Sequence, residues 1–336
     1  MRSADAQIRA LRGPKEPGTE PPRLEMETFP DGSARAIATV FLRNGECPLA
    51  CVYCALYRHT TARPATGAEI AAQIRAARGM FPEAAGLKLY NASSLFEPLS
   101  IDQNPGSLRE IAAALSGLDL VVVEARSENA HRAGSFRRLL AGRLEVAIGL
   151  ESSDDELLFQ LNKPTSVERF RAAAATLAAD EIFLRAFVLA GPPFVPEGEV
   201  RYAAVKTFGE ASRAGARVVS LLPVVSRHEP MEALRRAGFF SEISLDEYFE
   251  TVCDCAGDLP AGAGRRPVVL AETEFLSQLP GCANCGPEKT RRLAGLNSTG
   301  QIARFACNDH RPVPPVAVRR PRPGEIAAAL ARRAPA

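Results

Sequence analysis

Apolar runs and amphipathic segments alternate along much of this 336-residue chain, and this alternation constrains the fold more than any other feature. Six apolar runs indicate buried strands, at residues 36–42, 86–90, 118–123, 144–150, 181–189 and 216–222. Helical patterns lie between them, at residues 67–80, 107–115, 130–140, 167–178 and 197–214. This order predicts a parallel sheet with helices outside. Because crossovers share one hand and six strands are too few for a closed eight-stranded barrel, we expect an α/β fold with an open, partial (βα)6 TIM-like barrel.

The loop after the first expected strand carries Cys47, Cys51 and Cys54, in the spacing C-x3-C-x2-C. Three thiolates this close in sequence can reach one soft metal centre together. Structural zinc sites need four ligands, and His59 is the only candidate for a fourth nearby. Three cysteines instead suit a four-iron cluster that keeps one iron open for another ligand. A zinc knuckle or buried free thiols are the alternatives.

Small, polar and charged residues follow the other expected strands, at the sheet edge where α/β barrels place their sites. The candidates are Asn91, Ser93, Ser94, Glu124, Arg126, Gly149, Glu151 and Pro192, together with Arg185 on the fifth strand. Ordinary structural roles compete with a binding role at each position. These are helix caps for the serines and Glu151, a salt bridge for Glu124 and Arg126, and a turn at Gly191-Pro192-Pro193.

The cysteine motif, with Tyr53 directly before its last cysteine, resembles that of the radical S-adenosylmethionine (radical SAM) enzymes. Further segments resemble the elongator-subunit and methylthiotransferase-like branch, and are most similar to the archaeosine synthase β-subunit (RaSEA) type of tRNA-modifying protein. They are KLYNASSLFEP, VVVEARSE, VAIGLESSDDELLFQLNK and RAFVLAGPPF. The resemblance covers residues 36–222. The Gly-Gly-Glu type sequence that many members carry after the second strand is absent, and a Ser-rich loop followed by Glu97 stands in its place.

The resemblance implies a [4Fe–4S] cluster on Cys47, Cys51 and Cys54 whose open iron binds S-adenosylmethionine (SAM). It implies cleavage of SAM to methionine and a 5′-deoxyadenosyl radical, which would abstract hydrogen from a substrate at the barrel mouth. The electron would come from a donor such as ferredoxin or flavodoxin. A modified tRNA base is the expected substrate; the alternative is a small molecule or a peptide.

The resemblance also gives the strand-end residues roles towards SAM. Tyr53 and the wall formed by Pro192 would lie against the adenine, and Asn91, Ser93 and Ser94 near the amino group. Glu124 and Arg126 would contact the ribose or the carboxylate, which an arginine can engage with two hydrogen bonds. Gly149 would allow close backbone approach, Glu151 would face ribose hydroxyls or an ammonium group, and Arg185 is counted with the cofactor-binding residues.

A second cysteine group, Cys282, Cys285, Cys307 and His310, has the spacing C-x2-C-x21-C-x2-H. Four nitrogen and sulfur ligands in paired spacing are typical of zinc, so a structural zinc is the first interpretation. An auxiliary iron–sulfur cluster, which could also use Cys253 or Cys255, and free thiols are the alternatives.

We expect four parts: a loose N-terminal lead-in (1–34), a radical SAM core (35–225), an extension with the second cysteine group (226–312) and an Arg/Pro-rich tail (313–336). The net charge of +2 is too small to indicate nucleic-acid binding by itself. The arginine-rich tail could bind RNA phosphates, so a non-catalytic, zinc-binding RNA adaptor is a further alternative. Clustered cysteines, no secretion signal and no long apolar segment favour a cytoplasmic protein without a membrane partner.

Overall fold

The structure is a computed structural model that describes residues 4–16, 20–257, 266–314 and 316–331. Parts of the expected lead-in (1–3 and 17–19) and of the expected tail (315 and 332–336) lie outside these ranges, as do residues 258–265 of the extension.

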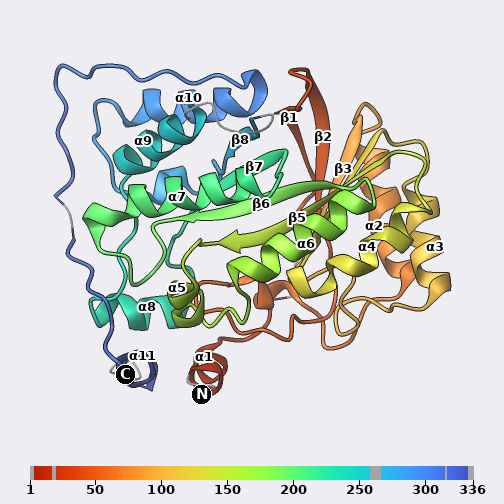
Figure 1. Cartoon of the computed structure of the whole chain (residues 1–336), viewed down its shortest axis with the longest axis horizontal. Helices are drawn as coiled ribbons and strands as arrows, with labels where there is room; N and C mark the ends of the chain where they lie inside the picture. Colours follow the sequence, from red (N-terminus) through yellow and green to blue (C-terminus); the bar gives the residue numbers. More distant parts are fainter. Residues whose placement is uncertain (1–3, 17–19, 258–265, 315, 332–336) are drawn as a thin grey trace.

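One eight-stranded sheet runs through the molecule in the order β1 to β8 (Figure 1). The strands are β1 (Arg23–Thr28), β2 (Ala34–Phe41), β3 (Gly86–Tyr90), β4 (Leu120–Ala125), β5 (Arg143–Glu151), β6 (Phe183–Ala190), β7 (Val218–Pro223) and β8 (Val268–Ala271). β1 is antiparallel to β2, and all later neighbours are parallel. The carboxyl ends of β2 to β8 therefore meet at one edge, in a nearly closed barrel that confirms the expected fold class.

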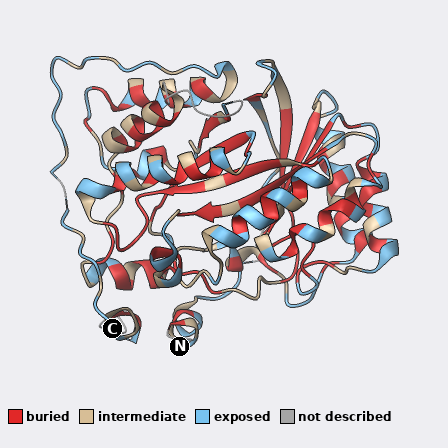
Figure 2. Ribbon diagram, viewed as in Figure 1, coloured by how far each residue is buried: buried red, intermediate tan, exposed pale blue. Residues whose placement is uncertain are grey.

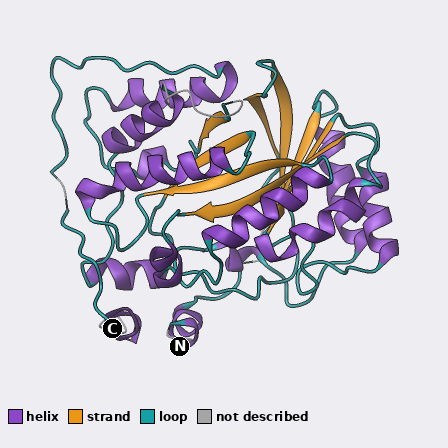
Figure 3. Cartoon of the chain, in the orientation of Figure 1, coloured by secondary structure: helices purple, strands orange, loops and turns teal. Residues whose placement is uncertain are grey.

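Helices lie outside the sheet, most of them in the connections between parallel strands (Figure 3). They are α1 (Asp5–Leu11), α2 (Gly67–Met80), α3 (Pro105–Ala114), α4 (Ala133–Arg137), α5 (Asp155–Gln160), α6 (Val167–Ala179), α7 (Val200–Arg213), α8 (Glu229–Arg236), α9 (Leu245–Ala256), α10 (Gly286–Thr299) and α11 (Glu325–Ala331). Local signals fix several starts: Thr66 and Glu69 form a capping box on α2, and Asn104, Ser166 and Ser244 cap α3, α6 and α9. No helix among the described residues has both the length and the apolar character needed to cross a bilayer.

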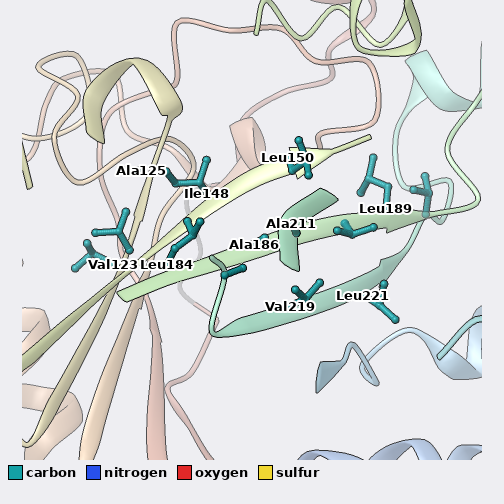
Figure 4. Packing of buried hydrophobic residues seen from close by; sticks show 14 of the residues in the cluster. Val123, Ala125, Ile148, Leu150, Leu184, Ala186, Leu189, Ala211, Val219 and Leu221 are labelled. Atoms are coloured by element: carbon teal, nitrogen blue, oxygen red, sulfur yellow. The ribbon is translucent and has the colours of Figure 1, made fainter. Parts of the chain in front are cut away.

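The central strands are buried on both faces, as their continuous apolar runs indicate (Figure 2). Alternate residues such as Val121 and Val123 pack outward against the helices, in the cluster that also holds Ala211 of α7 (Figure 4). Leu120 and Val122 face the other way, into a small apolar cluster with Ala147. The outer layer is the larger core, so the inner face is free to carry polar groups.

The expected loose lead-in contains α1 and β1, so this expectation was wrong for those residues. β1 lacks the usual apolar alternation because its pattern is inverted: Leu24 and Met26 are exposed, whereas Glu27 is buried. The acid is tolerated inside because Arg185 and Lys88 pair with it. The expected helix at 130–140 is a 3-10 turn followed by the short α4, and α5, α10 and α11 were not expected.

Candidate functional site

The three-cysteine loop follows β2 and is held by the connection between α5 and α6. Val52 N–H donates to the carbonyl of Leu161 over 3.0 Å, and the Asn162 side chain donates to the carbonyl of Ala50 over 2.8 Å. Asn162 adopts φ +56°, a left-handed conformation that asparagine tolerates better than most residues. The Gly-Leu-Glu and Asn-Lys segments of the sequence therefore meet at the cysteine loop.

Helix α1 and the residues after it hold the other side of this loop. The guanidinium of Arg9 donates to the carbonyl of Pro48 over 2.6 Å, and that of Arg12 donates to the carbonyl of Leu49 over 3.2 Å. Arg12 also pairs with Glu46 at 2.7 Å. The loop is thus fixed from both sides by hydrogen bonds to its backbone and by the Arg12–Glu46 ion pair.

Cys51 is buried, whereas Cys47 and Cys54 are half-buried. Burial raises the pKa of Cys51 to about 12, although the nearby Lys163 acts in the opposite direction. Burial likewise raises the pKa of Cys54 to about 11. Leu49 N–H lies 3.4 Å from the sulfur of Cys47, as a donor to it. Because metal centres bind thiolates, a metal here would have to displace these protons.

The Cys47–Cys54 loop supplies three sulfurs, one fewer than the four ligands of a structural zinc ion. A four-iron cluster that takes one cysteine on each of three irons fits a set of three.

Glu151 is the most distorted residue near the loop. It has φ +63°, and the β5–β6 register shifts between Gly149 and Glu151. Its Oε1 accepts from Lys163 Nζ at 2.6 Å, and Nζ also donates to the carbonyl of Gly149 at 2.6 Å. A Cβ on Gly149 would lie 2.1 Å from that Oε1, so only glycine leaves room for the carboxylate. A backbone strained in this way persists where the surroundings impose it, often at binding sites.

Tyr53, in the cysteine loop, lies near enough to Glu151, Cys51 and Cys54 to interact with them electrostatically. Burial and the negative charge of Glu151 raise the pKa of the Tyr53 phenol well above its ordinary value. Tyr53 therefore stays protonated and offers a hydroxyl and a ring face next to the loop.

A pocket opens at the carboxyl ends of β2, β3 and β4, beside the residues that follow the cysteine loop. About 520 Å³ of space outside the protein atoms lies in this region, a figure that includes open solvent. Its lining comprises Glu20, Phe41, Leu42, Arg43, Leu56, His59, Tyr90, Asn91, Ala92 and Glu124. Asn91 N–H donates to Glu124 Oε2 at 2.6 Å. Burial, with a smaller effect from the charge of Glu151, raises the pKa of Glu124 to about 8.

Several buried polar atoms at the ends of β3 and β5 have no hydrogen-bond partner, and one of these residues, Asn91, lines the pocket. They are both amide atoms of Asn91, the hydroxyl of Ser93 and Oε2 of Glu151. Buried polar groups are nearly always paired, so such a group of unpaired atoms indicates a binding site for a polar ligand. Both donors and acceptors are present, which suits a ligand with amino, carboxylate and hydroxyl groups. The residues therefore fit the expected cofactor.

Three other expected site residues are engaged in local structure. Ser94 Oγ accepts from Phe96 N–H at 3.1 Å, as in a turn. Arg126 pairs with Glu97, although its buried Nε has no partner. Pro192 lies in a buried turn after Gly191, whose φ of +73° and close approach to Ile243 require glycine.

Arg185 lies within β6, several residues before its carboxyl end, and is only 3% exposed. Its Nε donates to Glu145 at 2.5 Å and its Nη2 to Glu27 at 3.0 Å. Its Nη1 lies 3.3 Å from the hydroxyl of Tyr90, which lines the pocket. Arg185 thus belongs to a buried ionic network inside the barrel and reaches the pocket only through Tyr90.

The second cysteine group comes together as its spacing indicates. One ligand atom from each of Cys282, Cys285, Cys307 and His310 lies within 4.8 Å of all the others. Cys253 and Cys255, which could have joined this group, lie buried in α9 and are not among its members.

Sequence reasoning gave no specific role to two residues near the cysteine loop. Lys163, which the sequence placed only within the segment VAIGLESSDDELLFQLNK, donates to the carbonyl of Gly149 and to the carboxylate of Glu151. His228 follows β7, is 4% exposed, has no hydrogen-bond partner at either ring nitrogen and lies 6.0 Å from the ring centre of Tyr57. Burial, with a smaller effect from Arg58, lowers its pKa to about 4. The one available signal was a histidine placed just after a strand end.

No protein-family model and no curated protein matches this sequence. Methylornithine synthase (PylB) matches it in structure with a TM-score of 0.52 and 16% identity, over 78% of this chain and 70% of that one. Elp3 of the archaeon Methanocaldococcus infernus matches with a TM-score of 0.47 and 16% identity, over 61% of this chain and 52% of that one. The radical S-adenosylmethionine methyltransferase TsrM of Kitasatospora setae matches with a TM-score of 0.44 and 16% identity, over 60% of this chain and 40% of that one. The chain thus spans about half the length of the Elp3 structure and less of TsrM. It shares the fold of methylornithine synthase.

Proposed function

We propose that this chain is a radical SAM enzyme. The observation that carries the proposal is the set of unpaired buried polar atoms on Asn91, Ser93 and Glu151, at the carboxyl ends of β3 and β5, on the same sheet edge as the three cysteines that follow β2. Bound at Cys47, Cys51 and Cys54, a [4Fe–4S] cluster would supply the electron that cleaves SAM to methionine and a 5′-deoxyadenosyl radical.

The chain's own residues would bind and orient the cofactor. Lys163 neutralises one oxygen of Glu151 and leaves Oε2 as a fixed, desolvated acceptor. Asn91 offers a donor and an acceptor at the pocket wall. Tyr53 offers its ring beside the cysteines. Glu151 is held by Lys163 before a ligand arrives, so little of its side-chain entropy remains to be lost on binding.

Two carboxylates of this region, Glu124 and Glu151, lie near enough for their charges to interact. Glu124 and Glu151 repel each other, and this repulsion helps to keep Glu124 protonated up to about pH 8. A sulfonium and an ammonium group would relieve the repulsion, because an opposite charge nearby favours the ionised carboxylate. We therefore expect SAM to lower the pKa of Glu124 when it binds.

We propose a modified tRNA base as the substrate, on the strength of the sequence resemblance to the RaSEA type. Two arginines of the tail are not free to bind RNA phosphates without breaking an ion pair, since Arg319 pairs with Glu325 and Arg320 with Glu199. A small molecule or a peptide is the other candidate substrate. A reductant such as ferredoxin or flavodoxin and a reducing cytoplasm complete the proposal, and the eight free cysteines are consistent with that compartment.

Anaerobic reconstitution with iron and sulfide tests the proposal. We expect a brown protein that converts SAM to 5′-deoxyadenosine under dithionite, measured by chromatography. Cys51→Ala should abolish both iron retention and SAM cleavage. Cys253→Ala, which removes a buried cysteine outside the loop, should keep both. A colourless zinc protein, or cleavage that survives Cys51→Ala, would defeat the proposal, and the first result would favour the RNA adaptor.

A further inference from the structure

The second cysteine group has the geometry of a closed, single-ion metal site. Its four ligand atoms all lie within 4.8 Å of one another, and Cys285 Sγ lies 3.4 Å from His310 Nδ1. Zinc bonds of about 2.3 Å to sulfur and 2.0–2.1 Å to nitrogen place tetrahedral ligands less than roughly 4 Å apart. The group needs only a small contraction to reach that geometry. A four-iron cluster, which binds each ligand to a different iron, needs a wider set.

Backbone contacts hold the sulfurs in place before any ion binds. Arg311 N–H lies 3.3 Å from the sulfur of Cys282 as a donor to it. Asn284 donates from its side chain to the carbonyl of Asp309 at 2.8 Å, which fixes the 307–310 turn against the start of α10. Two ligands at the start of α10 and two in the turn are thereby brought together from segments more than twenty residues apart in sequence.

Asp246 of α9 completes the arrangement from outside the ligand set. Its Oδ1 accepts from Lys289, whereas its Oδ2 is buried, has no hydrogen-bond partner and lies 3.8 Å from His310 Nε2. Metal-bound histidines usually donate their second ring N–H to a carboxylate. If His310 Nδ1 binds the ion, its Nε2 carries a hydrogen and can donate to Asp246 Oδ2, which has no other donor. One bound ion therefore explains both the converged ligands and the unpaired oxygen.

We propose that Cys282, Cys285, Cys307 and His310 bind one zinc ion, with His310 ligating through Nδ1 and Asp246 as the residue that positions its ring. All four coordination positions come from protein, so the site is structural and leaves no position for substrate. It is independent of the proposed SAM chemistry and holds whether or not the Cys47–Cys54 loop binds a cluster.

The zinc would fix the beginning of a long C-terminal segment (Figure 1). Just before the site, Arg304 pairs with Glu250 at 2.7 Å, on α9. Beyond it, Arg319 N–H donates to the carbonyl of Gly238 at 3.1 Å, and the segment ends in α11, which packs on α8 and α1. The ion therefore anchors the chain that runs from α10 to the helix beside the cysteine loop.

Metal analysis of the full chain tests the proposal. In the Cys47→Ala/Cys51→Ala/Cys54→Ala background, any tightly held metal belongs to the second site. We expect about one zinc per chain and no acid-labile sulfide, and adding Cys307→Ser should lower the zinc content at least tenfold. Cobalt(II) added to the metal-free wild-type chain should give the intense visible bands of a tetrahedral thiolate site, which keeps the test valid should the multiple variant fail to fold.

The role of Asp246 has its own readout. Asp246→Asn should weaken zinc binding about 10–100-fold in competition with a chromophoric chelator. Asp309→Asn is the matched control, because Asp309 contributes only its backbone carbonyl to the contact with Asn284. The zinc affinity of this variant should stay within about twofold of the wild type. Iron and sulfide in place of zinc, zinc that survives Cys307→Ser, or an octahedral cobalt spectrum would overturn the zinc assignment. Equal affinities for the two aspartate variants would overturn the positioning role.

Discussion

The two cysteine groups of this molecule differ in what surrounds the sulfur atoms. Around Cys282 and its partners, four ligands converge within 4.8 Å, and the one unpaired neighbour, Asp246 Oδ2, points at a ligand. Around Cys47, Cys51 and Cys54, the set has three members, and unpaired atoms of Asn91, Ser93 and Glu151 lie at the ends of β3 and β5, on the same sheet edge.

If both groups bind metal as proposed, the same residue type makes a closed site in one place and an open site in the other. Where the protein supplies every ligand, nothing further can bind, and the ion can only stabilise the fold. Where it supplies one ligand too few and leaves neighbouring polar groups unsatisfied, a second molecule is needed to complete the site. The number of converged ligands and the position of the unpaired atoms distinguish the two cases.

The largest expected effect comes from the cation that supports the open site. Lys163→Met should lower the free energy of unfolding by about 3–5 kcal/mol, because it leaves Glu151 buried without a positive partner. Urea denaturation followed by circular dichroism measures this. Arg291→Met, which breaks an exposed pair with Glu288, should change stability by less than about 1 kcal/mol. Similar losses for both variants would mean that Glu151 is not held as a desolvated charge.

The pH dependence of stability probes the second carboxylate of the open site. Glu124 keeps its proton up to about pH 8 in the folded chain but releases it near its ordinary pKa of 4.5 when unfolded. The folded state therefore binds more protons between these values, and stability should fall as pH rises from about 4.5 to 8, by about 1.4 kcal/mol per unit of pKa difference at most. In Glu124→Gln this component of the slope should vanish. An unchanged slope in denaturant titrations at pH 5, 6.5 and 8 would contradict the raised pKa.

Alanine substitutions at two glycines, one crowded (Gly149) and one with open space around it (Gly79), test the β5 bulge. Gly149→Ala should cost about 1–3 kcal/mol and weaken SAM binding, because its Cβ would displace the Glu151 carboxylate. Gly79→Ala makes the same change in α2, where nothing lies within 4 Å of the new Cβ, and should stabilise the chain by roughly 0.5–1 kcal/mol. Thermal melts and calorimetric SAM titrations compare the two. If both variants bind SAM with wild-type affinity, Gly149 has no role in SAM binding.

The smallest effect is expected at the closed site. Asn284→Ala removes the bond to the Asp309 carbonyl and should cost about 1 kcal/mol while leaving the zinc content unchanged, since no ligand is lost. Thermal denaturation and metal analysis of the same sample measure both quantities. Loss of zinc in this variant would show that the 307–310 turn is not held by the ion itself.

Features set by local sequence were predictable here, and features set by distant partners were not. Helix α2 has its expected bounds because Thr66 and Glu69 cap it locally. The convergence of Cys282, Cys285, Cys307 and His310 followed from paired spacing alone. β1 was missed because its buried Glu27 depends on Arg185 and Lys88, which lie far along the chain.

The site residues divide in the same way. The Gly-Leu-Glu segment indicated where β5 ends. The left-handed backbone of Glu151 and its contact with Lys163 depend on the β5–β6 register, which cannot be predicted from hydrophobic periodicity. Arg185 could not be separated from a cofactor ligand in the sequence, because its acidic partners come from β1 and β5. Ser93 and Ser94 are adjacent, yet only one of them makes a local hydrogen bond.

The packing of α11 on α1 also bears on how the protein matures (Figure 1). Helix α1 grips the cysteine loop through Arg9, and α11 is the last described element to leave the ribosome. A nascent chain that has emerged as far as α10 therefore has a complete sheet and all three cysteines, but lacks the helix that supports α1. Until α11 emerges, the helix that grips the cysteine loop is therefore without its contact to α11.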